Sequence, residues 1–309
     1  MKTACITTVC TDDRFQYYIP MFIHTCKRAY PEYPVKVFLR GRLDDITRSA
    51  ISLIPYKGYT VEENFGKDFP HRVSSCNSIR FILGKDHFPK CDIVYFTDVD
   101  FLICNHVPLQ PLADFYWNKM EAMGQPCLAA RGPISGIKRP EVCESWDGKF
   151  TRIAAGVFGV KYPDYFDATK KARRFYEEVL KSGRCDGHDN HAAASYREYD
   201  EVMLCRILKD SKLKIPKSKY RYVNGEVANS HYRSIHVGDF KTRFRRRFKS
   251  MSKMCRILSR DCVRYFDQMD MFDKRWKKIA DICMLVDKDI DKEIRRIRKH
   301  CKKRAQRGL

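Results

Sequence analysis

The fold is decided by one stretch of the sequence, Cys91-Asp92-Ile93-Val94-Tyr95-Phe96-Thr97-Asp98-Val99-Asp100-Phe101-Leu102-Ile103. Its segment 93–96 is continuously apolar, which indicates a strand buried on both faces. A strand of that kind belongs to a mostly parallel sheet that is covered by helices. Asp98 and Asp100 follow it directly, so we expect them at the carboxyl end of the strand, where open α/β sheets bind ligands.

The spacing of the two carboxylates suits binding of one ligand by both. Side chains of a strand repeat every second residue, so Asp98 and Asp100 are expected to point the same way. Paired carboxylates suit a hard divalent cation, and such a cation is commonly shared with phosphate oxygens. The stretch therefore gives a first indication of an enzyme that acts on a nucleoside diphosphate.

The flanking sequence alternates between the two kinds of element. Strands are expected at 3–10, 35–39 and 59–61, and helices at 17–30, 43–54 and 74–83. This alternation predicts a parallel sheet with right-handed crossovers. Beyond Asp100 we expect a helix at 112–123, a strand at 126–130, a strand with two glycines at 152–160, and helices at 165–181 and 199–208.

Composition points to a globular protein. The chain has 309 residues, of which 44% are apolar and 13% aromatic, and no apolar run is long enough to cross a bilayer. The beginning of the sequence lacks the pattern of a signal peptide, so we expect a cytoplasmic protein. Its 14 cysteines are scattered without a C-x-x-C pair, which favours reduced, mostly buried thiols over disulfides or zinc.

Charge divides the chain into two parts. Residues 241–309 hold 24 Lys and Arg against 9 Asp and Glu, so most of the formal net charge of +22 lies there. We therefore expect a nucleotide-binding domain at 1–240 and a basic helical extension at 241–309. In the extension, apolar residues recur every three or four positions from Trp276 to Cys301, which predicts a helix with one apolar face.

Three uses of that apolar face stay open. The helix can dock on the rest of the chain, pair with a second copy as a homodimer, or lie on the anionic inner face of a membrane. The segment 243–249, which reads R-F-R-R-R-F-K, suits lipid headgroups, a polyanionic acceptor or nucleic acid. No recognised nucleic-acid-binding module occurs in the sequence, so nucleic acid ranks last.

Several motifs occur in a characteristic order: T-T-x-x-T-D-D at 7–13, an arginine-bearing helix, D-V-D at 98–100, A-A-G-V-F-G-V at 154–160, Y-D-E at 199–201 and H-V-G-x-x-K at 236–241. This order resembles the nucleotide-diphospho-sugar transferases of the GT-A fold, most of all the glycogenin-type family 8 enzymes. The resemblance spans roughly residues 3 to 241. It implies an α/β, Rossmann-like fold with a mostly parallel sheet.

The resemblance also implies a metal site. Asp98, Asp100 and His236 match the family's ligands for Mn²⁺ or Mg²⁺, an ion that stabilises the charge of a departing diphosphate. The family usually has H-x-x-G-x-x-K at the last motif, whereas this chain is one residue shorter between His236 and Gly238. That contraction puts the loop geometry in question.

Further residues follow from the same likeness. Those that match positions binding the donor nucleotide sugar are Thr8, Asp12, Tyr17, Arg80, Asp98, Ala155, Gly156, Gly238 and Lys241. Asp200 matches a carboxylate near the reacting anomeric carbon, and Asp189 and His188 are further candidates. Structural alternatives remain: Asp200 can simply favour a helix start, and Gly156 can mark a bulge.

The resulting hypothesis is a hexosyltransferase that moves a sugar from a UDP-sugar, with retention, to a glycan, lipid-linked or protein acceptor. Asp200 and Glu201 could instead supply the base of an inverting enzyme. One alternative is a nucleotidyltransferase acting on sugar phosphates, which would release pyrophosphate rather than a nucleoside diphosphate. The other is a nucleic-acid-binding protein whose affinity, carried by the tail, would fall steeply with salt.

Overall fold

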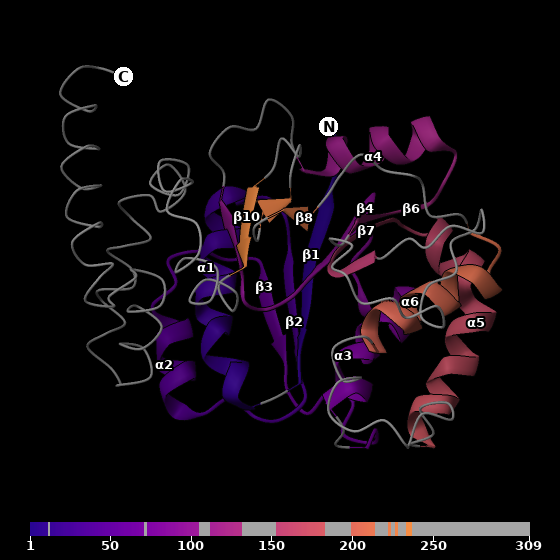
Figure 1. Ribbon diagram of the computed structural model, residues 1–309. Helices are drawn as coiled ribbons and strands as arrows, with labels where there is room; N and C mark the ends of the chain where they lie inside the picture. Colours follow the sequence, from indigo (N-terminus) through magenta and orange to yellow (C-terminus); the bar gives the residue numbers. More distant parts are fainter. Residues whose placement is uncertain are drawn as a thin grey trace.

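The computed structural model describes residues 1–11, 13–70, 73–104, 112–131, 153–182, 199–213, 222–223, 226–227 and 233–236. At its centre lies a six-stranded sheet with the order β3-β2-β1-β4-β7-β6 (Figure 1). Its strands are β1 (Ala4–Cys10), β2 (Val35–Leu39), β3 (Tyr59–Glu62), β4 (Ile93–Thr97), β6 (Cys127–Arg131) and β7 (Ile153–Lys161).

The predicted α/β class with a mostly parallel sheet is confirmed. Strands β1 to β4 pair in parallel, with Thr7 of β1 opposite Phe96 of β4. Strand β7 runs antiparallel to β4 and to β6, so it is the reversed strand in this sheet. The carboxyl ends of β1 to β4 therefore meet at one edge, as the alternation of strands and helices predicts.

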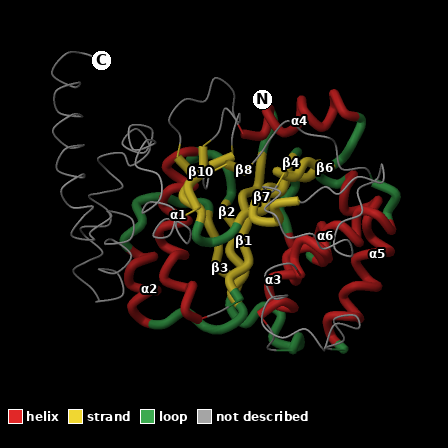
Figure 2. Tube along the Cα trace, in the orientation of Figure 1, coloured by secondary structure: helices red, strands yellow, loops and turns green. Residues whose placement is uncertain are grey.

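Helices cover both faces of the sheet (Figure 2). One face carries α1 (Ile19–Ala29), α2 (Asp45–Ser52) and α4 (Leu112–Met123), and the other carries α3 (Val73–Ile82), α5 (Asp164–Lys181) and α6 (Tyr199–Asp210). Short 3-10 turns, η1 (Asp13–Tyr18) and η2 (Lys85–His87), precede α1 and β4. Asp44, expected inside a helix, instead caps α2 by accepting a hydrogen bond from the Thr47 N–H.

Strand β4 is buried along its whole length, as predicted from its apolar run. Tyr95 points into the core beneath α1, whereas Phe96 points into the core beneath α3 and α5. Its neighbour β7 needs a glycine at position 159 because a Cβ there would overlap the ring of Tyr116 from α4. The glycine thus allows a helix to approach the sheet closely.

The chain leaves the main sheet directly after β4. The apolar residues that follow Asp100 form β5 (Phe101–Cys104), which pairs antiparallel with β10 (Arg233–His236) and lies against α1. A second small pair joins β8 (Tyr222–Val223) to β9 (Glu226–Val227). The basic extension at 241–309 lies outside the described residues.

The described cysteines fit the expectation of reduced thiols. Cys5, Cys10, Cys26 and Cys127 are buried thiols, and burial raises the pKa of Cys127 to about 12. Such thiols behave as small apolar side chains.

Within the described part of the chain, no helix has the length and apolar character needed to span a membrane.

Candidate functional site

Asp98 and Asp100 lie in a tight turn between β4 and β5. The Phe101 N–H donates to the Asp98 carbonyl oxygen at 3.2 Å, which closes a four-residue turn. The expectation that an extended strand aligns the two carboxylates is therefore wrong, because Val99 and Asp100 occupy the centre of a turn. Val99 is buried in the core, and Asp100 is 8% exposed. The turn, rather than strand periodicity, holds both acids at the carboxyl edge of the sheet.

Arg80 contacts the first of these carboxylates. It lies near the end of α3, is 5% exposed, and its Nη1 forms an ion pair with Oδ1 of Asp98. Its guanidinium also lies 5.0 Å from the centre of the Phe81 ring. An ion pair with a mostly buried cation fixes the orientation of the Asp98 carboxylate. The structure thus brings together two of the residues predicted from the sequence.

Gly156 leaves room for the other oxygen of Asp98. The Asp98 N–H donates to the Gly156 carbonyl at 3.2 Å across the β4–β7 pair. A Cβ at position 156 would lie 2.5 Å from Oδ2 of Asp98 and 3.3 Å from the Phe101 ring. The pairing of β7 with β6 is also irregular here, since Ala129 faces Phe158 while Ala130 faces Ala154. The register shift agrees with the predicted bulge, and the glycine also leaves room for the Asp98 carboxylate.

Strand β10 brings the last predicted metal ligand to the same turn. His236 lies opposite Phe101 in the antiparallel pair, and Phe101 directly follows Asp100 in the sequence. The backbone therefore brings together residues that are more than 130 positions apart in the sequence. The orientation of the His236 side chain lies outside the description.

The donor set has the chemistry of a site for a hard divalent cation. Asp98 and Asp100 offer carboxylate oxygens, which suit Mn²⁺ or Mg²⁺, and His236 offers a nitrogen from a backbone position beside them. No cluster of three potential metal-binding side chains occurs among the described residues. Of the three predicted metal ligands, Asp98 and Asp100 are those whose side chains the structure describes.

Other predicted residues are placed only in part. Thr8 lies in β1 and is 1% exposed, with a buried hydroxyl that has no hydrogen-bond partner among the described residues. Tyr17 lies in η1, Ala155 in β7 and Asp200 at the second position of α6, and their side chains are not described. Outside the described residues lie Asp12, His188, Asp189, Gly238 and Lys241.

The structure adds two residues that the sequence did not single out. Phe15 in η1 follows the carboxyl end of β1, is 40% exposed, and stacks on Tyr18 with ring centres 5.9 Å apart. Thr97 ends β4, and its hydroxyl is buried and has no partner among the described residues. The signal for Phe15 was an aromatic residue between the polar Arg14 and Gln16, whereas nothing in the sequence distinguished Thr97 from a strand residue.

Comparisons with known proteins were made for sequence and for fold. No protein-family model matches the chain, and no curated protein matches its sequence. Among solved structures, the galactosyltransferase LgtC bound to donor and acceptor sugar analogues aligns with a TM-score of 0.42 at 11% identity, covering 89% of this chain and 99% of that one.

Two fungal structures align over a smaller part of the chain. Core-mannan synthase A from Aspergillus fumigatus, in an Mn/GDP form, gives a TM-score of 0.41 at 8% identity over 67% of this chain and 70% of its own. The mannosyltransferase Ktr4p from S. cerevisiae gives 0.41 at 11% identity over 67% and 65%. These similarities are too low to transfer a function, so the function is argued from the site itself.

Proposed function

We propose that the chain is a metal-dependent glycosyltransferase of the GT-A type, which moves a sugar from a UDP-sugar to an acceptor with retention. The observation that carries this proposal is the Asp98–Val99–Asp100 turn at the carboxyl edge of a mostly parallel sheet. That edge is where α/β sheets bind nucleotides. Arg80, Gly156 and the backbone of His236 all lie around the same turn.

In this proposal Asp98, Asp100 and His236 hold Mn²⁺ or Mg²⁺. The bound ion would supply the positive charge that stabilises a departing diphosphate. Arg80 has a supporting role, because its ion pair with Asp98 orients that carboxylate. Asp100 is 8% exposed and already placed by the turn. Little rearrangement is then needed at these two acids on binding.

The donor is proposed to lie across the ends of β1, β4 and β7. Phe15, beyond the end of β1, offers an exposed ring against which a base can stack. Gly156 and Ala155, which lack large side chains, would border the pyranose beside Asp98, while Lys241 would meet the diphosphate as a second cation. Asp200, at the start of α6, would orient hydroxyl groups of the sugar near the anomeric carbon.

The proposal is tested by nucleotide binding measured with and without metal. Titration calorimetry of the full chain should show UDP binding that requires Mn²⁺ and is abolished by EDTA. Incubation with UDP-sugars and Mn²⁺ should release UDP, and no pyrophosphate. Asp100→Asn should remove the metal-dependent binding while the melting temperature stays within a few degrees.

Two results would contradict the proposal. UDP binding that is equally strong in EDTA would argue against the metal site, and pyrophosphate release would identify a nucleotidyltransferase. Binding to nucleic acid alone, unchanged in Asp100→Asn and strongly reduced by salt, would favour the role of the basic tail.

A further inference from the structure

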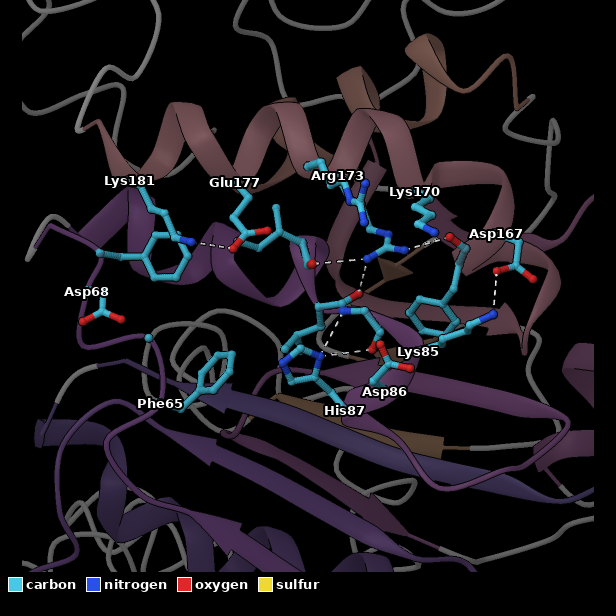
Figure 3. Close-up of a pocket in the computed structure, with 17 residues that line it drawn as sticks. Phe65, Asp68, Lys85, Asp86, His87, Asp167, Lys170, Arg173, Glu177 and Lys181 are labelled. Atoms are coloured by element: carbon cyan, nitrogen blue, oxygen red, sulfur yellow. Dashed lines mark hydrogen bonds and ion pairs between the residues drawn. The ribbon is translucent and has the colours of Figure 1, made fainter.

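A groove of about 450 Å³ lies beside α5 (Figure 3). Its lining belongs to the face of the sheet opposite α1 and includes neither Asp98 nor Asp100. One wall is α5, from Phe166 to Lys181. The other wall is formed by the segment after β3, around Phe65, and by the segment from the end of α3 through η2, around His87. The groove therefore joins three parts of the chain that are distant in sequence.

The charges that line the groove are nearly balanced. Five cationic side chains line it, Lys85, Lys170, Arg173, Arg174 and Lys181, together with four carboxylates, Asp68, Asp86, Asp167 and Glu177. Residues 1–240 are similarly balanced, with 36 Lys and Arg against 29 Asp and Glu, because most of the formal net charge of +22 lies in the basic extension. A polyanion gains little from such a surface, because the carboxylates repel it. The lining instead offers hydrogen-bond donors and acceptors side by side.

Several of these groups are held in place by neighbours. Lys85 Nζ lies 2.9 Å from Oδ1 of Asp167, which links η2 to α5 across the groove. Lys181 Nζ lies 2.8 Å from Oε1 of Glu177 and 5.7 Å from the centre of the Phe69 ring. Both ion pairs are exposed and contribute little to stability. They do present fixed polar groups along both walls.

The floor of the groove is rigid. Arg173 is 8% exposed, and its guanidinium donates to the carbonyl oxygens of Ile82, Leu83 and Phe166 at 2.7 to 3.3 Å. Its Nε donates to Oγ1 of Thr169 at 3.0 Å. Desolvation lowers the pKa of Arg173 from its ordinary value. This network fastens α5 to the end of α3 and so fixes the width of the groove.

An aromatic wall completes one side. Phe65 is half-buried, and its ring meets His87 edge-on with centres 5.9 Å apart. The Gly84 N–H donates to Nδ1 of His87 at 3.1 Å, which fixes the plane of the imidazole. A partly open ring beside fixed polar groups is suited to the apolar C–H face of a sugar ring together with its hydroxyl groups.

The groove runs from one edge of the sheet toward the other. Lys161 pairs with the first residue of β4, and α5 begins three residues later. Asp167, in the first turn of α5, therefore lies near the edge of the sheet where β1 to β4 begin. The Phe65–Phe69 segment follows β3 and belongs to the carboxyl edge, where Asp98 lies. The stretch of α5 from Asp167 to Lys181 is roughly 21 Å long at 1.5 Å per residue. This length suits an extended chain of several units.

We propose that this groove binds a neutral oligosaccharide chain and leads it toward the carboxyl edge of the sheet. The role as an anchor for the acceptor glycan rests on the proposed glycosyltransferase function; the binding itself does not. The balanced charge disfavours an anionic chain, and the charged rims disfavour a lipid tail. A neutral polyhydroxylated chain can use both the donors and the acceptors that line the groove.

The test is titration calorimetry of the full chain with neutral linear hexasaccharides: maltohexaose, cellohexaose and α-1,6-mannohexaose. A heparin hexasaccharide serves as the anionic comparison. The groove variant is Asp86→Ala with Lys170→Ala, two exposed lining residues of opposite charge. The matched control is Lys171→Ala with Glu178→Ala, two exposed residues of α5 that do not line the groove. Each double variant leaves the net charge unchanged.

Wild type should bind at least one neutral hexasaccharide. The groove variant should bind it about tenfold more weakly, since two sets of hydrogen bonds are lost. The control variant should bind it as wild type does. Binding of UDP with Mn²⁺ should be the same in all three proteins, because the substitutions are remote from Asp98.

Three outcomes would overturn the proposal: no binding of any neutral hexasaccharide, equal weakening in both double variants, or preferential binding of the heparin hexasaccharide that the groove variant reduces. Failure of the proposed enzymatic function looks different. In that case UDP with Mn²⁺ would not bind to wild type, while hexasaccharide binding and its dependence on Asp86 and Lys170 would remain.

Discussion

The two ends of β4 both carry aspartates, but these are bound in different ways. At the amino end, Oδ1 of Asp92 accepts from Lys2 Nζ at 3.0 Å, and Oδ2 accepts from the Thr3 N–H at 2.8 Å and from its hydroxyl at 2.9 Å. At the carboxyl end, Oδ1 of Asp98 meets Arg80, while Oδ2 occupies space that a Cβ at position 156 would need. The first arrangement fastens the beginning of the chain to β4; the second holds a carboxylate at the carboxyl edge of the sheet. We infer that the first aspartate serves stability and the second serves ligand binding.

The sharpest test of the difference between the two ends compares Asp92→Asn with Asp100→Asn, which alters the second acid of the turn at the carboxyl end. Asp100→Asn should lower UDP release from a UDP-sugar by at least about 10³-fold, or roughly 4 kcal/mol in activation free energy, because a ligand of the metal loses its charge. Asp92→Asn should leave turnover per folded molecule within about twofold of wild type, since it only fastens the chain. Steady-state assays of UDP release measure both, and equal losses would remove the distinction between the two ends.

A second comparison uses two buried arginines. Arg80→Met should lower UDP release about 10²-fold, because Asp98 loses the cation that orients it. Arg173→Met should instead lower the free energy of unfolding by about 2 kcal/mol, because the carbonyls of Ile82 and Leu83 lose their donor. Chemical denaturation and the same turnover assay separate the two effects. Loss of turnover in folded Arg173→Met would show that the contact between α5 and the end of α3 also supports the Asp98 turn.

A third comparison uses the two glycines of β7. Gly156→Ala should weaken Mn²⁺-dependent UDP binding about tenfold, because the new Cβ displaces the Asp98 carboxylate. Gly159→Ala should leave UDP binding intact but destabilise the fold by about 1 to 3 kcal/mol, because the buried Tyr116 ring has no room to move. Calorimetry with UDP and thermal denaturation distinguish them, and unchanged binding in Gly156→Ala would contradict the role of that space.

The smallest effect is expected at Asp92. Burial disfavours its charge, but the hydrogen bonds from Thr3 and Lys2 lower the pKa of Asp92 below its ordinary value of 3.8. The stabilisation is therefore complete above about pH 4 and disappears as the pH falls through the lowered folded-state pKa. Wild type should exceed Asp92→Asn in unfolding free energy by about 1 kcal/mol at pH 7. Urea denaturation should show the two curves converging below pH 4; a constant difference would contradict the assignment.

The sequence predicted those features that depend on local pattern. Strand β2 has the predicted bounds, Val35–Leu39, and α3 begins and ends within one residue of its prediction, since apolar runs and helical spacing are local signals. The turn at Asp98 escaped prediction because no glycine or proline interrupts the apolar run on either side of it. No separate strand was therefore predicted at Phe101–Cys104.

The remaining gaps concern partners that are distant along the chain. The contact between Asp92 and Thr3 spans 89 positions, and Gly159 accommodates Tyr116 from a different element. Neither can be read from local spacing, because both depend on which strand lies beside which. The reversed direction of β7 has the same origin, since hydrophobic periodicity reports which faces are buried but not which way a strand runs.

The small β5–β10 ribbon has a consequence for the far part of the chain. It fixes the point from which the basic extension departs, because His236 is paired opposite Phe101, beside the acidic turn. Lys241 follows only five positions later, so full extension keeps it within about 18 Å of that point. A molecule that binds to the first basic residues is therefore held near the Asp98–Asp100 turn. The short connecting segment then sets the effective concentration of that molecule at the turn.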